Sequence, residues 1–225
     1  MKVKICGISN EIDALAAIEE GADAIGFVMG GKVLPVEVEP YAQWVREIIK
    51  KFAVNVDSFL VTHLSGAEDI LDLARYIKCT GIQISEYIPL EEMKKVRENF
   101  NGKIIKTIVS NEDCAFDRMK AYESYCDFFL MDSRNAGYTG GTGAENDWVR
   151  CAELINKTNV PVFIAGGLKT ETVESAIKIA KPYGTDVSTG VSCFSDNYLK
   201  KDRKDRCRIA EFIRRSKQCL SVMEK

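Results

Sequence analysis

The sequence predicts an α/β protein folded as a single (β/α)8 TIM barrel, and three observations support that prediction. Short β-rich runs alternate with amphipathic helical stretches along the whole chain. Eight such runs occur in 225 residues, or about one every 28 residues, a spacing that suits a (β/α)8 barrel. The runs are apolar on successive residues, as in parallel strands covered on both faces. No linker or shift in composition divides residues 1–225, so we expect one domain.

The expected elements follow from local residue patterns. The clearest helix covers 11–18, with Asn10 as its N-cap, and a later helix covers 170–180, with Thr170 as its cap. The basic stretch 200–215 has apolar residues at helical spacing and is expected to form the solvated face of a terminal helix. An open doubly wound sheet is the alternative, although no Gly-x-Gly-x-x-Gly follows the first strand to bind a dinucleotide. The expected strands comprise residues 2–6, 24–29, 58–63, 80–84, 103–109, 127–132, 160–165 and 184–188.

Composition and charge argue against several classes of partner. A net charge of -2 gives no electrostatic reason to expect binding to nucleic acid or to an acidic membrane. The eight cysteines are dispersed without a Cys-x-x-Cys pair, which favours free thiols in a reducing compartment. The first residues contain no apolar signal core, and no apolar run reaches 18 residues. We therefore expect a cytoplasmic protein with no nucleic-acid or membrane partner.

Polar side chains at the ends of the predicted strands indicate a catalytic site, because these ends share one mouth of a barrel. Cys6 ends the first strand and Asp132 ends the sixth, so a thiol and a carboxylate can act as a base and acid pair on one substrate. The only histidine, His63, ends the third strand. A single histidine disfavours metal chemistry that needs paired histidines, and we expect neither a metal nor another cofactor. Lys106 on the fifth strand is an alternative nucleophile that could form a Schiff base.

Glycine-rich segments after the sixth, seventh and eighth strands predict a phosphate site. Glycine lets the backbone approach an anion closely, and successive N–H groups can converge on it. Loops after the last two strands of a barrel often bind phosphate with the help of a helix N-terminus. The predicted phosphate-binding residues are Gly141, Thr142, Gly143, Gly166, Gly167, Ser188, Thr189 and Gly190.

Five segments together carry a more specific signature. They are Lys-Ile-Cys-Gly-Ile at 4–8, Gly-Ala-Asp-Ala-Ile-Gly-Phe-Val at 21–28, Asp-Ser at 132–133 with Gly-Gly-Thr-Gly at 140–143, Pro-Val-Phe-Ile-Ala-Gly-Gly-Leu at 161–168, and Asp-Val-Ser-Thr-Gly-Val at 186–191. In this order and spacing they resemble the phosphoribosylanthranilate isomerase family over essentially the whole chain.

The resemblance implies a reaction and its residues. In that family, which serves tryptophan biosynthesis, an N-linked 5-phosphoribosyl amine undergoes a metal-free Amadori rearrangement to a 1-amino-1-deoxyribulose 5-phosphate. The resemblance makes Cys6 the general base that removes the sugar C2 proton and Asp132 the general acid that protonates the ring oxygen. It also implies a phosphorylated small molecule as partner and a monomeric or homodimeric protein.

Two departures from the family pattern concern the end of the pocket that meets the amine substituent. After the second strand the family has a Ser-Pro-Arg type segment, whereas this chain has Lys32 and no arginine before Arg46. After the fourth strand the family's Gln-Leu-His-Gly becomes Gln-Ile-Ser-Glu at 83–86, so the histidine is absent. These departures leave open a barrel that acts on another phosphoribosyl amine, or a non-catalytic phosphosugar sensor. The expected substrate-binding residues are Lys4, Lys32, Gln83 and Ser85.

Overall fold

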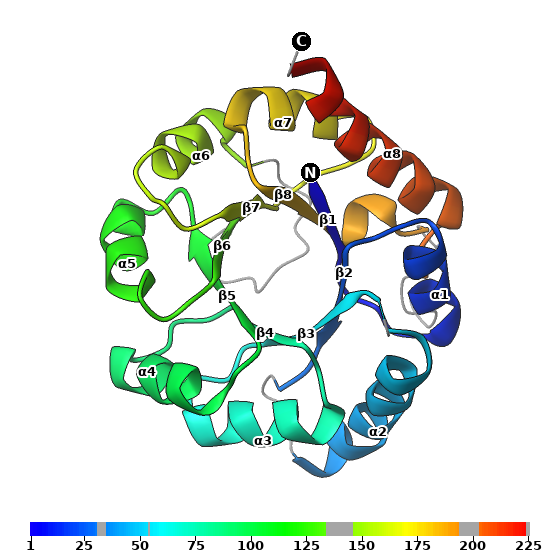
Figure 1. Ribbon diagram of the computed structural model, residues 1–225, viewed down its shortest axis with the longest axis vertical. Coiled ribbons are helices and arrows are strands. Elements are labelled where there is room, and N and C mark those ends of the chain that lie inside the picture. The colour runs from blue at the N-terminus through cyan, green and yellow to red at the C-terminus, as the bar shows by residue number, and fades with distance from the viewer. Residues whose placement is uncertain (31–34, 54, 134–145, 194–202, 224–225) are drawn as a thin grey trace.

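Eight parallel strands form a closed barrel in the order β1 to β8, with the helices arranged around it (Figure 1). The structure is a computed structural model that describes residues 1–30, 35–53, 55–133, 146–193 and 203–223. Each strand pairs with the next one along the chain, and β8 pairs with β1, so the sheet has no free edge. The (β/α)8 prediction is confirmed, and the open-sheet alternative is wrong.

The strands lie within two residues of their predicted bounds. β7 is the shortest, because Pro161 has no N–H group to donate to the sheet and the strand begins only at Val162. Beyond its other end, the Ala165 N–H still donates to the Met131 carbonyl at 2.8 Å. The strands are β1 Lys2–Ile5, β2 Ala24–Val28, β3 Asp57–Thr62, β4 Gly81–Ile84, β5 Lys103–Val109, β6 Phe128–Asp132, β7 Val162–Ile164 and β8 Gly184–Val187.

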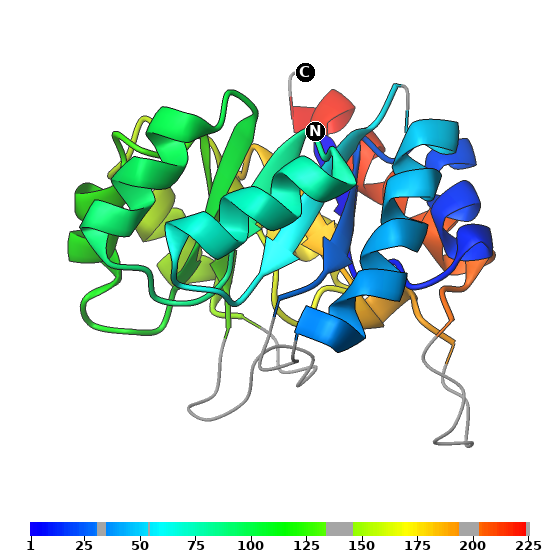
Figure 2. The same ribbon diagram turned by 90° about the horizontal axis from the view of Figure 1, so that it is seen from below.

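The helices cover the outside of the barrel, as the side view in Figure 2 shows. Asn10 caps the first helix as predicted, with its side-chain oxygen accepting the Asp13 N–H at 2.9 Å. The predicted cap at Thr170 is wrong. The helix begins at Val173, while the Thr170 hydroxyl donates to Glu171 and Thr172 accepts the Lys169 N–H in the turn before it. The helices are α1 Glu11–Glu19, α2 Pro35–Phe52, α3 Ala67–Ile77, α4 Leu90–Asn99, α5 Ala115–Tyr122, α6 Trp148–Ile155, α7 Val173–Ala180 and α8 Arg206–Met223, with a 3-10 turn, η1, at Thr189–Val191.

Buried side chains form two separate layers, one on each side of the strands. Because side chains alternate along a strand, Val3 and Ile5 of β1 pack outward under the helices, whereas Lys4 and Cys6 point into the barrel. The interior layer contains Ala24, Phe59, Val61, Ile105, Leu130 and Phe163 together with Cys6. The chemistry-bearing residues at the strand ends therefore stand on a packed hydrophobic interior.

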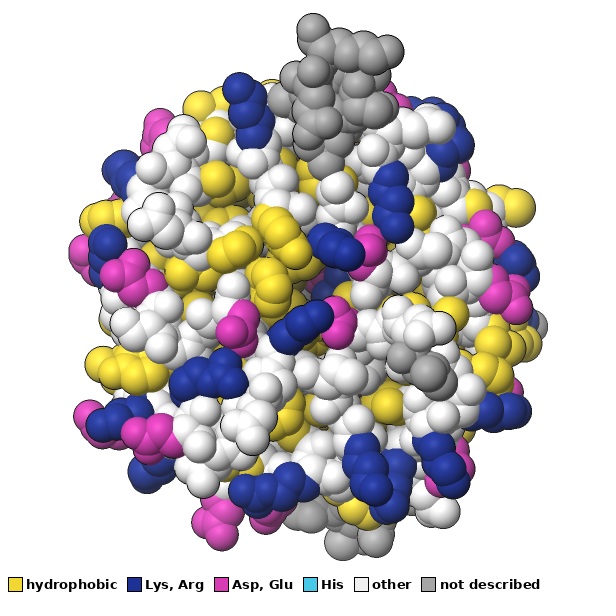
Figure 3. All heavy atoms as spheres, viewed as in Figure 1, with side chains coloured by type: hydrophobic (Ala, Val, Ile, Leu, Met, Phe, Trp, Pro, Cys, Tyr) yellow, Lys and Arg dark blue, Asp and Glu magenta, His cyan; other side chains and the backbone are white. Residues whose placement is uncertain are grey.

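The face at the N-terminal ends of the strands carries an aromatic cluster. The Phe128, Phe163 and Tyr183 rings have centroids 5.4 to 5.6 Å apart. Figure 3 looks onto one end of the barrel, where hydrophobic side chains gather near the centre with charged groups of both signs beside them. In the part of the chain that the structure describes, no helix is long and apolar enough to cross a membrane.

Candidate active site

Cys6 lies at the seam where the first and last strands meet. Its N–H donates to the Val187 carbonyl at 2.8 Å, which extends the β1–β8 pairing by one residue and fixes the position of the thiol. The residue is 8% exposed. A Cβ atom at Gly26 would lie 3.0 Å from Lys4 Nζ and 3.1 Å from Cys6 Sγ. Glycine at this position of β2 therefore leaves room for the ammonium and the thiol inside the barrel.

A buried ion pair stands beside the thiol. Lys4 Nζ lies 3.0 Å from Asp186 Oδ1, and both side chains are inside the barrel. Burial alone lowers the pKa of Lys4, but the charge and hydrogen bond of the Asp186 carboxylate, with a smaller contribution from Cys6, outweigh it, and the pKa is raised. Lys4 thus stays positively charged next to Cys6. Asp186 was not predicted, although it lies two residues before Ser188 and so faces the same side of β8.

The Cys6 thiol experiences opposing influences. Burial raises its pKa, Lys4 lowers it, Asp186 raises it again, and Lys204 lowers it. Burial prevails, so the pKa of Cys6 is above its ordinary value. In the free protein the thiol form therefore predominates at neutral pH, and the thiolate forms as the pH rises.

Asp132 ends β6 and reaches the same mouth from another side, with β7 and β8 between it and β1. The loop after β7 lies close to the Asp132 carboxylate, because a Cβ atom at Gly166 would lie 2.9 Å from Asp132 Oδ1 and 2.5 Å from Ser133 Oγ. Gly166 also has φ +86°, a left-handed conformation that favours glycine. The glycine that shapes the β7 loop thus also makes room for the carboxylate.

Asn146, which the sequence analysis missed, ties together the loops behind Asp132. Its Oδ1 accepts the Ser110 hydroxyl at 2.6 Å, and its Nδ2 donates to the Ala165 carbonyl at 3.1 Å. Its own N–H donates to the Gly166 carbonyl at 3.3 Å. The residue is 5% exposed, and no motif in the sequence singles it out.

The loops after β7 and β8, which the sequence predicts to bind phosphate, lie against each other. Gly166 and Gly167 both have positive φ angles, of +86° and +69°. The η1 turn packs directly on the β7 loop, because a Cβ atom at Gly190 would lie 1.9 Å from the Leu168 carbonyl oxygen. The structure thus brings Gly166 and Gly167 close to the Ser188, Thr189 and Gly190 segment. The other predicted residues of this site, Gly141, Thr142 and Gly143, lie outside the described residues.

The ends of β3 and β4 supply further polar side chains to the mouth of the barrel. Gln83 is 4% exposed, and its Nε2 lies 3.5 Å from Ser85 Oγ and from Thr107 Oγ1. Its Oε1 is buried and accepts no hydrogen bond from the described residues. His63 Nδ1 lies 3.3 Å from Glu86 Oε1, so the histidine links the two loops. Lys32, predicted to lie near this end, is outside the described residues.

Lys106 faces away from the mouth. Its ammonium donates to the carbonyls of Ile84 at 3.2 Å, Glu86 at 2.9 Å and Thr107 at 2.8 Å. It also lies 5.3 Å from the centre of the Tyr122 ring on α5, in the layer between strands and helices. This outward position argues against the Schiff-base alternative. Among the residues described, no group of three or more His, Cys, Asp or Glu side chains is arranged to hold a metal ion.

Comparison with known proteins identifies relatives of this chain. Residues 3–199 match the family model described as N-(5'phosphoribosyl)anthranilate (PRA) isomerase. The N-(5'-phosphoribosyl)anthranilate isomerase of Methanocella arvoryzae is 32% identical over 214 residues, which are 94% of this chain and 96% of the relative.

Solved structures agree with the sequence matches. The crystal structure of phosphoribosyl anthranilate isomerase from Thermotoga maritima has a TM-score of 0.80 and 30% identity, covering 97% of this chain and 99% of that one. A phosphoribosyl anthranilate isomerase in complex with reduced 1-(o-carboxyphenylamino)-1-deoxyribulose 5-phosphate has a TM-score of 0.77 and 28% identity, with the same coverage of both chains.

Proposed function

The chain belongs to the N-(5'-phosphoribosyl)anthranilate isomerase family, and from this membership we propose how its barrel mouth carries out the reaction. The protein is an isomerase of tryptophan biosynthesis that converts N-(5'-phosphoribosyl)anthranilate into 1-(2-carboxyphenylamino)-1-deoxyribulose 5-phosphate. The observation that supports this most directly is the presence of Cys6 and Asp132 at the ends of β1 and β6, beside the paired β7 and β8 loops.

In the first step, Asp132 acts as the general acid. It donates its proton to the ring oxygen of the ribose as the bond from that oxygen to C1 breaks, and the nitrogen lone pair forms a Schiff base with C1. Asp132 is suited to this role because it is partly exposed at the mouth, where a substrate can reach it.

In the second step, Cys6 acts as the general base. The positive Schiff base makes the C2 proton acidic, the Cys6 thiolate removes it, and the electron pair forms a double bond between C1 and C2. The resulting enolamine gives the ketone by moving the proton of its C2 hydroxyl to C1. Lys4 supports this step because its ammonium stabilises the thiolate inside the barrel.

The remaining predicted contacts orient the substrate. Backbone N–H groups of Gly166, Gly167 and the η1 turn would hold the phosphate. The buried Oε1 of Gln83 is an acceptor without a donor among the described residues, which suits a substrate hydroxyl, and Ser85 lies beside it. The anthranilate end would meet Ser85, which replaces the family's histidine, and the His63–Glu86 pair next to it.

The proposal is tested by following the fluorescence of freshly generated N-(5'-phosphoribosyl)anthranilate. We expect wild-type protein to accelerate its conversion, and Cys6→Ala and Asp132→Asn each to lower kcat by about a hundredfold or more. Cys79→Ala is the matched control, because Cys79 is also buried but packs against α3 outside the barrel.

Three results are informative. Near wild-type rates in both variants would contradict the acid and base assignment. Loss of activity in Cys79→Ala as well would indicate that cysteine removal disturbs the fold. A folded wild-type protein that binds ribose 5-phosphate without converting the anthranilate compound would favour the alternative amine or the sensor.

A further inference from the structure

Lys204 is a buried lysine that neither the sequence motifs nor the proposed reaction uses. It is 8% exposed and lies just before α8, far from the strand ends in sequence. Its Nζ donates to the Ser188 carbonyl at 2.9 Å, to the Ser188 hydroxyl at 3.2 Å and to the Ser192 hydroxyl at 3.2 Å. The ammonium thus lies directly against the loop that follows β8.

The backbone around Lys204 holds it in this place. The segment before α8 forms an antiparallel bridge with the β8 loop at Ser192 and Lys204. On either side, the Cys193 N–H donates to the Arg203 carbonyl at 2.7 Å and the Asp205 N–H donates to the Val191 carbonyl at 2.8 Å. These two hydrogen bonds form the bridge, and they fix the backbone of the lysine against the β8 loop.

The same ammonium also lies close to the β1 loop. A Cβ atom at Gly7 would lie 2.7 Å from Ser188 Oγ and 3.5 Å from Lys204 Nζ. Gly7 has φ +71° and directly follows Cys6. Lys204 therefore contacts the predicted phosphate loop at a point where that loop touches the residue next to the general base.

The chemistry of the ammonium fixes the orientation of Ser188. A lysine ammonium can only donate hydrogen bonds, so the Ser188 hydroxyl must accept from it. The proton of that hydroxyl then points away from Lys204 and can be donated to another acceptor. A phosphate oxygen of the substrate is such an acceptor, and the positive charge behind the hydroxyl strengthens the donation.

We propose that Lys204 is a positioning residue for the substrate phosphate: it holds the Ser188 hydroxyl and the β8 loop so that both donate to the phosphate oxygens. This inference rests on the proposed function in one respect, namely that the β7 and β8 loops bind phosphate.

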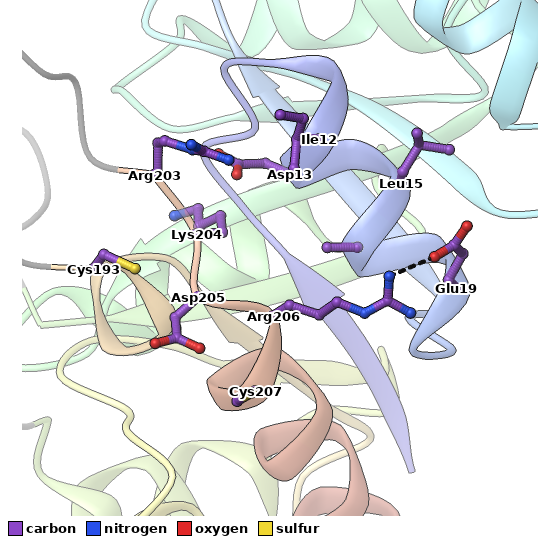
Figure 4. Close-up of a pocket in the computed structure, with 11 residues that line it drawn as sticks. Ile12, Asp13, Leu15, Glu19, Cys193, Arg203, Lys204, Asp205, Arg206 and Cys207 are labelled. Atoms are coloured by element: carbon purple, nitrogen blue, oxygen red, sulfur yellow. Dashed lines mark hydrogen bonds and ion pairs between the residues drawn. The ribbon is translucent and has the colours of Figure 1, made fainter.

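Arg203, on the outer side of the same segment, offers a matched control (Figure 4). There Lys204 and Arg203 line a groove of about 700 Å³ between α1 and the start of α8, and the Arg203 side chain extends toward Asp13. Arg203 is exposed and lies on the other side of the segment from Ser188. Arg203→Met thus removes one positive charge from the same segment without touching the β8 loop.

The test compares wild type, Lys204→Met, Lys204→Arg and Arg203→Met. Calorimetry measures the Kd for ribose 5-phosphate, and the fluorescence assay measures kcat and KM. We expect Lys204→Met to raise both Kd and KM about tenfold or more, since a charge-assisted hydrogen bond network is lost from binding. The fall in kcat should be smaller, because Lys204 affects the chemical step only by favouring the Cys6 thiolate. Lys204→Arg should restore most of the affinity, and Arg203→Met should match wild type.

A folded Lys204→Met with the wild-type Kd would overturn the proposal, as would an equal loss of affinity in Arg203→Met. If Lys204→Met does not fold, Ser188→Ala takes its place, and an unchanged Kd in that variant overturns the proposal instead. Wild-type protein that binds ribose 5-phosphate without isomerase activity would refute the proposed reaction alone. Wild-type protein that does not bind ribose 5-phosphate would refute the phosphate site and the role of Lys204 together.

Discussion

At the scale of single residues, the ionisation of Cys6 is set by neighbours of opposite sign. Lys4 and Lys204 favour the thiolate, whereas burial and Asp186 favour the thiol. The nearest cation is itself paired with Asp186 at 3.0 Å, so its field at the sulfur is partly cancelled. The thiol is therefore less acidic than a cysteine beside an unpaired lysine.

This balance predicts how the reactivity of Cys6 depends on pH. Iodoacetamide alkylates the thiolate and the pKa of Cys6 is raised, so the rate of Cys6 alkylation should increase as the pH rises and level off only above the ordinary cysteine value of about 8.5. Mass spectrometry of protein alkylated at pH values from about 6 to 10 measures this dependence. An alkylation rate that is already constant at neutral pH would show that the cations outweigh burial.

Residue types at the strand ends were predictable, but their partners were not. Cys6, Asp132 and the β7 and β8 glycines follow apolar runs, and a barrel places such residues at one mouth. Lys204 had no such signal, because its contact with Ser188 depends on how the segment before α8 returns to the barrel. Asn146 was missed for a similar reason, since its hydrogen bonds join three different loops.

At the scale of elements, the loops after β7 and β8 behave as one unit. The Gly190 turn packs on the Leu168 carbonyl, and Gly166 packs on Asp132 and Ser133. A change in one loop is therefore transmitted to the acid as well as to the phosphate site.

The Gly166→Ala variant tests this coupling. A Cβ atom there would be 2.5 Å from Ser133 Oγ and would add strain at φ +86°, so we expect a loss of about 2 to 3 kcal/mol in the free energy of unfolding and a large drop in kcat/KM. Gly21→Ala separates the two causes, because Gly21 has φ +89° but nothing within 4 Å of its Cβ position. That control should lose about 1 kcal/mol and keep its activity. Urea unfolding and the fluorescence assay measure both, and equal losses in the two variants would argue against the coupling.

Strand positions were predictable to within two residues because apolar runs are bounded by polar turns. The start of α7 was not, because both Thr170 and Thr172 can cap a helix. The choice depends on the turn in which Thr172 accepts the Lys169 N–H, and that turn follows from the course of the β7 loop.

At the scale of the whole molecule, the barrel closes where β1 meets β8. Lys4 on β1 and Asp186 on β8 are paired in the register of the two strands, and their side chains form the buried ion pair. The β1–β8 pairing thus carries a charge interaction as well as backbone hydrogen bonds.

Breaking this pair should destabilise the closed barrel. Lys4→Met leaves the Asp186 carboxylate buried without its cation, and we expect a loss of about 3 to 5 kcal/mol in the free energy of unfolding. The double variant Lys4→Met with Asp186→Leu removes both charges and should recover a substantial part of that loss. Urea unfolding of wild type, Lys4→Met, Asp186→Leu and the double variant measures the interaction. If the double variant were as unstable as the sum of the single changes, the two charges would be independent of each other.

The closing of the barrel also bears on the order in which the chain is made. Asp186 follows Lys4 by 182 residues, so during synthesis Lys4 and Cys6 leave the ribosome long before the carboxylate does. Until β8 has been synthesised, the lysine beside the general base has no buried counter-charge. We therefore expect nascent chains that lack β8 to be unable to isomerise substrate, because the barrel cannot close and the ion pair cannot form.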